Sequence, residues 1–96
     1  MHIHINREKF LVIKDEQEYN LPKKEFEVLC LLCTIPGKVY SRSAIFQRIW
    51  GETSLSKERT VDVHIVNLRK KLGNELIRTI KGVGYKMTTD NIDVKE

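Results

Sequence analysis

The stretch RTVDVHIVNLRKKL, residues 59–72, constrains the fold of this chain more than any other segment. At about 100° per residue, a helical wheel places its large aliphatic side chains on one face. A stripe of this kind must pack against another element, so the segment is predicted to be an amphipathic helix that ends at Gly73. The predicted core stripe consists of Val61, Ile65, Leu68 and Leu72.

The opposite face of this predicted helix carries cations near its ends, one amide and two valines, but no acid. A face that is merely solvated more often mixes glutamate with lysine. The pattern suits the major groove of DNA, because cations bond phosphates or guanine edges, asparagine bonds an adenine edge in two places, and valines contact thymine methyl groups. Asp62 lies on a flank, where we expect it to pair with Arg42 or Arg69. The predicted contact face consists of Arg59, Val63, Val66, Asn67 and Lys70.

Around this helix the sequence predicts strands, two further helices and a hairpin. Residues 3–21 alternate apolar and polar side chains over short runs, as strands do. Residues 23–35 have helical spacing with Pro22 at their start, and a second helix begins near Ser41 and ends at Gly51. The segments LIRTI and YKMT flank KGVG and predict a glycine-containing hairpin. This order indicates an α+β domain with the layout of a winged helix-turn-helix.

Size and charge narrow the possible functions. Ninety-six residues make one domain, which we place at residues 1–88, followed by a C-terminal tail of residues 89–96. The net charge of +4 is mild, but residues 59–86 hold seven Lys or Arg against only Asp62 and Glu75. Positive charge therefore gathers in the later half, which favours nucleic acid as the partner. No apolar run approaches ~18 residues and no signal peptide is recognisable, so we expect a cytoplasmic protein with no membrane segment.

The predicted hairpin offers a second contact with nucleic acid. Gly82 and Gly84 permit a tight tip, and Arg78 and Lys81 lie beside it. A narrow tip with a cation suits a minor groove. Many hairpins share this pattern, so it indicates DNA binding only in combination with the basic helix.

Two motifs suggest metal or redox chemistry, and we interpret both otherwise. Cys30 and Cys33 form a C-x-x-C motif, but they lie in the apolar run FEVLCLLCTI, and no second cysteine pair completes a zinc site. His2 and His4 would share one face of a strand, which we interpret as solvated. A thiol oxidoreductase would need an exposed thiolate of low pKa, and a nuclease would need converging carboxylates. We expect no metal, no cofactor and no catalytic activity.

The segments ERTVDVHIVNLRKKL and IRTIKGVGYKM resemble the DNA-binding effector domain of OmpR/PhoB-type response regulators. The segment LPKKEFEVLCLLCTIPGKVYSRSAIFQRIWG extends the resemblance, which covers residues from about 3 to 87. It implies a winged helix-turn-helix with an N-terminal antiparallel sheet of four strands, three helices and a C-terminal β-hairpin wing. It also implies sequence-specific binding of double-stranded DNA and transcription regulation as the output domain of a two-component response regulator.

The resemblance also implies roles for individual residues. Groove-facing positions fall to Arg59, Val63, Val66 and Asn67, and the cation at the wing tip is Lys81. Positions beside the DNA backbone fall to Thr60, His64, Arg69, Lys70, Thr79 and Tyr85. Trp50 takes the place of an indole that contacts a phosphate, and the alternative is a partly buried core tryptophan. One loop takes the place of the segment through which this family contacts RNA polymerase, and the alternative is a plain connector. Its residues are Glu52, Thr53, Ser54, Leu55, Ser56 and Lys57.

This chain departs from the family pattern at several points. Members often carry cations at the positions of Val66 and Asn67, so we expect a different base preference and less charge-driven affinity. Pro22 stands where a threonine often caps the first helix, so that cap must come from elsewhere. The usual N-terminal receiver domain is absent from this chain, and we expect an excised output domain or a stand-alone version.

Two interpretations of the partner follow. In the family, two copies commonly bind direct repeats head to tail, so we expect a homodimer on DNA and a monomer for the isolated domain. The alternative is a stand-alone winged-helix module whose basic face binds protein or RNA.

Overall fold

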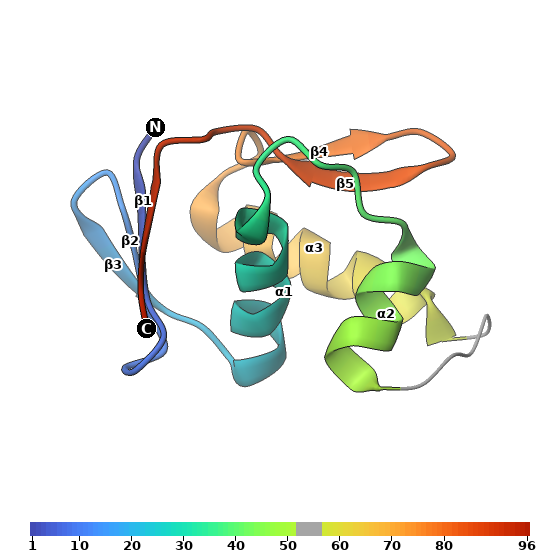
Figure 1. The fold of residues 1–96 in the computed structure, drawn as a ribbon, viewed down its shortest axis with the longest axis horizontal. Helices are drawn as coiled ribbons and strands as arrows, with labels where there is room; N and C mark the ends of the chain where they lie inside the picture. The colour runs from blue at the N-terminus through green and yellow to red at the C-terminus, as the bar shows by residue number, and fades with distance from the viewer. Residues whose placement is uncertain (52–56) are drawn as a thin grey trace.

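The computed structural model describes residues 1–51 and 57–96, and Figure 1 gives their arrangement. Three strands come first: β1 (Ile3–Asn6), β2 (Leu11–Lys14) and β3 (Gln17–Asn20). The helices α1 (Lys23–Thr34), α2 (Arg42–Trp50) and α3 (Arg59–Leu72) follow. The chain continues with β4 (Ile77–Ile80), β5 (Gly84–Met87) and β6 (Ile92–Lys95). The predicted α+β layout of strands, three helices and a C-terminal hairpin is confirmed.

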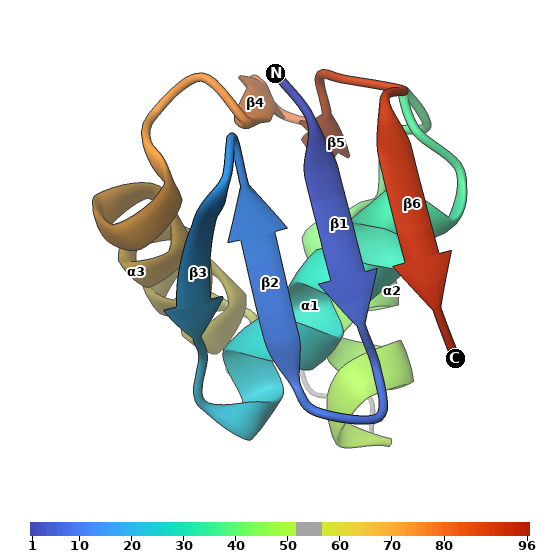
Figure 2. The same cartoon turned by 90° about the vertical axis from the view of Figure 1, so that its left-hand side faces the viewer.

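The N-terminal sheet has the strand order β3-β2-β1-β6 and covers one side of α1 (Figure 2). Strands β1, β2 and β3 are antiparallel neighbours, with Ile5 opposite Val12 and Val12 opposite Tyr19. Ile3, Ile5 and Val12 are fully buried. The period-two pattern is therefore confirmed for Ile3, Ile5 and Val12, but it is wrong for Phe10, which precedes β2 and is 42% exposed.

Strand β6 corrects two expectations about this sheet. The fourth strand is not N-terminal, and residues 89–96 are not wholly a tail outside the fold. Strand β6 pairs parallel with β1, and Ile3 lies opposite Ile92. The outer edge of β1 offers backbone N–H and C=O groups that need partners, and β6 supplies them while Ile92 packs against the core.

The helix ends follow local chemistry, with one difference from expectation. Ser41 caps α2, because its hydroxyl accepts a hydrogen bond from the Ala44 N–H at 3.0 Å. Gly51 ends α2 in the left-handed conformation, with φ of 76°. Pro22 occupies the N-cap position of α1, and no side chain donates or accepts a capping hydrogen bond there, so the expected substitute cap is missing. The acid Glu25 lies in the first turn, where it interacts favourably with the helix dipole.

Helix α3 packs its aliphatic stripe against α1 and α2 (Figure 1). All four predicted stripe residues are at most 2% exposed, which confirms the helical-wheel prediction. The opposite side of α3 therefore faces away from the body of the domain. Within the described ranges, no helix is both long enough and apolar enough to span a membrane.

Candidate nucleic-acid interface

The outer face of α3 carries side chains that are available to an external partner. Val63 and Val66 are 56% and 47% exposed, so this face presents two aliphatic side chains to solvent beside its polar ones. Arg59 and Lys70 are exposed, and Asn67 is half-buried. Among residues 1–51 and 57–96, no hydrogen bond or ion pair engages any of these three polar side chains. Helix α3 has 14 residues, and a helix of that length is about 21 Å long.

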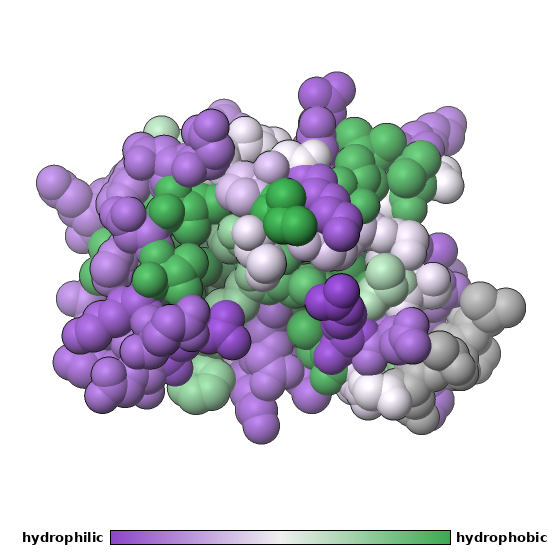
Figure 3. Space-filling model, in the orientation of Figure 1, coloured by the Kyte–Doolittle hydropathy of each residue, from purple (hydrophilic) through white to green (hydrophobic). Residues whose placement is uncertain are grey.

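The wing, which consists of β4, β5 and the turn between them, projects beside α3 (Figure 1). Gly82 lies in the turn with φ of 76°, a conformation that glycine adopts without strain. Lys81 and Arg78 are exposed, and their charges have no partner in the described part of the chain. Figure 3 shows a hydrophobic patch over the wing, and Val83 at the turn is 56% exposed. The wing tip thus combines a free cation with an apolar surface.

A close backbone approach fixes the base of the wing. The Tyr40 N–H donates to the Tyr85 carbonyl at 2.9 Å, and the Tyr85 N–H donates to the Tyr40 carbonyl at 3.0 Å. A Cβ atom on Gly84 would lie 2.0 Å from the Tyr40 carbonyl oxygen, so only glycine permits this approach. The connection between α1 and α2 is therefore joined to β5. The bridge between Tyr40 and Tyr85 has no signature in the sequence.

Arg69 links α3 to the wing. Its guanidinium donates at 2.8 Å to the Ile77 carbonyl and at 2.8 Å to the Thr79 hydroxyl, and its centre lies 5.7 Å from the centre of the Tyr85 ring. The resemblance assigned Arg69, Thr79 and Tyr85 to the DNA backbone. In the structure, these three side chains bind one another or other parts of the fold.

Asp62 joins three elements through its two carboxylate oxygens. The Tyr85 hydroxyl donates to Oδ1 at 2.7 Å, and the Arg42 guanidinium lies 2.8 Å from Oδ2. The expectation that Asp62 pairs with an arginine is confirmed for Arg42. Burial, together with the hydrogen bond to Asp62, raises the pKa of Tyr85 to about 12, so its hydroxyl remains a donor at neutral pH.

Lys71 anchors the other flank of α3 to the core. Its ammonium group lies 2.7 Å from a carboxylate oxygen of Glu25, whose side chain is 7% exposed. This pair was not predicted from the sequence. Its signal was the acid itself, because Glu25 lies beside a nearly continuous apolar run and a buried carboxylate needs a cation.

Trp50, His64 and Thr60 form a cluster at the start of α3. The Trp50 ring stacks on Phe46 at 5.0 Å and meets the His64 ring edge-on at 5.1 Å. The Nδ1 atom of His64 lies 2.7 Å from the Thr60 carbonyl oxygen. Trp50 is half-buried and packs against the core, so the core interpretation of this tryptophan holds, and its contact with phosphate stays a prediction.

Five of the six predicted polymerase-contact residues lie outside the described residues. They are Glu52, Thr53, Ser54, Leu55 and Ser56. Lys57, the sixth, is exposed.

The cysteines and histidines do not form a metal or redox centre within the described residues. Both thiols are buried, and burial raises the pKa of Cys30 to about 11 and that of Cys33 to about 12. An activated thiolate needs the opposite shift. His2 lies 2.8 Å from Asp93. In the described ranges, no group of three or more potential ligands is placed to hold a metal ion.

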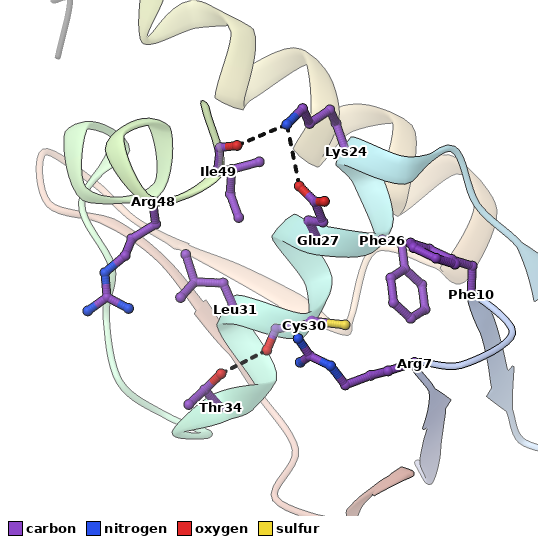
Figure 4. A pocket seen from close by; sticks show the side chains of 10 residues that line it. All are labelled: Arg7, Phe10, Lys24, Phe26, Glu27, Cys30, Leu31, Thr34, Arg48 and Ile49. Atoms are coloured by element: carbon purple, nitrogen blue, oxygen red, sulfur yellow. Dashed lines mark hydrogen bonds and ion pairs between the residues drawn. The ribbon is translucent and has the colours of Figure 1, made fainter. Parts of the chain in front are cut away.

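A hollow of about 530 Å³ lies between the β1–β2 turn, α1 and α2 (Figure 4). Phe10, Phe26 and Leu31 are among its apolar lining residues, and Arg7, Lys24 and Arg48 contribute cations. None of the described residues that line it belongs to α3. The hollow is therefore separate from the outer face of α3.

Comparison with known proteins adds independent evidence. The chain matches the family described as transcriptional regulatory protein, C terminal, over residues 16–87. It is similar to the heme response regulator HssR of Staphylococcus saprophyticus, with 40% identity over 87 residues, which cover 86% of this chain and 39% of that protein. The chain thus spans less than half the length of this curated relative.

Two solved structures share the fold. The DNA-binding domain of Bacillus subtilis CssR has a TM-score of 0.80 and 31% identity, over 90% of this chain and 99% of that chain. The DNA-binding domain of the response regulator AdeR, in complex with an intercistronic region, has a TM-score of 0.80 and 28% identity, over 93% of this chain and 96% of that chain.

Proposed function

The chain belongs to the family of C-terminal DNA-binding domains of transcriptional response regulators, and from this premise we propose how it binds DNA. Helix α3 enters the major groove of a duplex with its outer face toward the bases. The wing reaches the neighbouring minor groove, where Lys81 is the contacting cation. The two contacts together provide sequence-specific binding and, through it, regulation of transcription.

One observation carries this proposal. The outer face of α3 has exposed valines, and its cations and amide have no partners within the described ranges, while the other face of the same helix is buried. The two valines are available for apolar contact with a partner, such as the methyl groups of thymine in a major groove. The cations and the absence of acids on this face favour a negatively charged partner, and its asparagine and valines suit the base edges of a DNA major groove.

The contacts divide by chemistry into two groups. Arg59, Val63 and Asn67 read base edges, because their side chains suit guanine, thymine and adenine respectively. Phosphate contacts, which fix register without reading sequence, come from Trp50, Thr60, His64 and Lys70. Val66 adds apolar contact in the groove.

The assembly on DNA follows from the same proposal. Two copies bind direct repeats head to tail, and the isolated domain binds one half-site weakly as a monomer. In a longer protein, phosphorylation of a receiver domain would raise affinity by bringing two copies together. The loop that includes Lys57 would meet RNA polymerase, and the protein would act in the cytoplasm.

Replacement of Asn67 tests the base contact. Asn67→Ala should weaken binding to the preferred site by about 1–3 kcal/mol and relax the preference at one base pair. Asn74→Ala is the matched control, because Asn74 is exposed but lies beyond α3. The measurement is selection of bound duplexes from a random library, followed by titration of the selected site. An equal loss of affinity for all sequences would show that Asn67 does not read a base.

Replacement of Lys81 tests the wing contact. Lys81→Ala removes one phosphate contact, so a plot of log affinity against log salt concentration should flatten by about one unit. An unchanged slope would exclude Lys81 from the interface.

A further inference from the structure

Among the hydrogen bonds and ion pairs of the described residues, those of the Asp62 side chain connect α3 with both α2 and the wing. Its Oδ1 atom accepts from Tyr85 in β5 at 2.7 Å, and its Oδ2 atom lies 2.8 Å from the guanidinium of Arg42, the first residue of α2. Tyr85 is also held from elsewhere in the fold. The Tyr85 backbone is bonded to Tyr40, and its ring lies beneath Arg69. The carboxylate therefore has little freedom to change partners.

The location of this carboxylate is unfavourable on electrostatic grounds alone. Asp62 lies on the flank of the helix whose outer face is basic, and its side chain is 38% exposed. A negative charge there repels the phosphates that the proposed binding mode brings close. Arg42 offsets that charge, but an uncharged residue would need no offset. The benefit of a carboxylate at this position is its two fixed hydrogen-bond acceptors.

We propose that Asp62 and Tyr85 are positioning residues that set the angle between α3 and the wing, so that Lys81 reaches DNA while α3 lies in the major groove. The inference rests on the proposed function, because it concerns the geometry of the two proposed contacts. Tyr85 pairs with Thr79 in the wing ladder, and the tip with Lys81 lies beyond that pair. A small rotation of β5 about Tyr85 is therefore enlarged at the tip.

The test is a double-mutant cycle between Tyr85 and Lys81 on a selected duplex. Tyr85→Phe removes only the hydroxyl oxygen and keeps the ring beneath Arg69. In the wild-type background, Lys81→Ala should weaken binding about tenfold at 0.1 M salt. In the Tyr85→Phe background, the wing is no longer aligned, so the same change should weaken binding less than about threefold.

Two further variants separate positioning from other effects. Tyr19→Phe is the matched control, because among the described residues the Tyr19 hydroxyl donates only to Gln17, in β3 of the N-terminal sheet. In that background, Lys81→Ala should keep its full effect. Asp62→Asn keeps the shape but removes the charge and one of the two acceptors, so the side chain can no longer accept from both Tyr85 and Arg42. If Asp62 acts only through repulsion, this variant binds all duplexes more tightly and the effect of Lys81→Ala is unchanged; positioning predicts that the effect shrinks.

The outcomes distinguish the two proposals. If Lys81→Ala has no effect in the wild-type background, the proposed wing contact is wrong and the inference fails with it. If Lys81→Ala weakens binding equally in the wild-type and Tyr85→Phe backgrounds, the wing contact stands and positioning by Tyr85 is wrong. Thermal unfolding of each variant establishes that it is folded at the assay temperature, so a loss of coupling cannot come from unfolding.

Discussion

Substitution of Gly84 offers a direct test of how the wing is attached. In Gly84→Ala, the new Cβ atom would lie 2.0 Å from the Tyr40 carbonyl oxygen and 2.7 Å from its carbonyl carbon. Both neighbours are backbone atoms, so no side-chain rotation relieves the overlap. Non-bonded carbon and oxygen atoms need more than 3 Å, so β5 and the Tyr40 backbone must separate by about 1 Å or more.

That separation breaks the two backbone hydrogen bonds between Tyr40 and Tyr85, of 2.9 and 3.0 Å. Each bond contributes about 1 kcal/mol, and the displaced β5 also loses packing, so the free energy of unfolding should fall by about 2–4 kcal/mol. For a domain of this size, 1 kcal/mol lowers the melting temperature by about 4–8 °C. The expected drop is therefore about 10–30 °C, measured by circular dichroism during heating.

Gly82→Ala is the matched control for this prediction. Gly82 also has positive φ, +76°, but a Cβ atom there would meet nothing within 4 Å. The left-handed conformation alone should lower the free energy of unfolding by about 1 kcal/mol, which corresponds to a fall in melting temperature of about 4–8 °C. If Gly84→Ala is no less stable than Gly82→Ala, the close approach of the wing to Tyr40 is not what holds it in place.

Two further predictions concern buried groups. Lys71→Met should lower the free energy of unfolding by about 1–3 kcal/mol, because it leaves the Glu25 carboxylate buried without its cation, and adding Glu25→Gln should restore most of that loss in urea titrations. Burial raises the pKa of Cys33 from 9.0 to about 12, so the folded state holds its proton more tightly than the unfolded state, and stability present below pH 9 should be lost as pH rises toward 12. Cys33→Val should show a shallower fall in melting temperature across pH 9–12 than the wild type, and an identical fall would mean that this thiol does not contribute.

The sequence predicts this fold well where periodicity is strong and local. The α3 stripe and its bounds follow from fourteen residues with clear helical spacing, and Ser41 and Gly51 mark the ends of α2. Strand β6 could not be predicted in the same way. Its sequence, IDVK, is too short for a clear period, and its pairing partner β1 lies more than eighty residues away in the chain. Only the unpaired edge of β1, which exists after folding, makes that segment a strand.

The candidate site also has features that local sequence patterns predict and features that they do not. Which residues of α3 face outward is a local property, and the helical wheel identified them. Which cations remain free is a nonlocal property. Arg69 and Lys70 are adjacent and chemically similar, yet Arg69 binds the Ile77 carbonyl and Lys70 has no partner among the described residues. A guanidinium suits a carbonyl as well as a phosphate, so sequence alone cannot separate these two roles.

The distribution of paired and free cations sets the character of the proposed binding. Of the seven cations in residues 59–86, the described part of the structure engages two, Arg69 and Lys71, in holding α3 to the wing and the core. On the outer face of α3, Val66 and Asn67 are uncharged residues at positions where family members often carry cations. The other five cations remain available to phosphates, fewer than if positions 66 and 67 were also cationic, so one domain should bind with lower affinity and a shallower salt dependence than a member with those extra cations. Discrimination between sequences then depends on shape and base contacts, and tight binding requires a second copy on an adjacent repeat. A fixed angle between α3 and the wing matters more under these conditions, because a weakly charged interface cannot compensate for a misaligned contact.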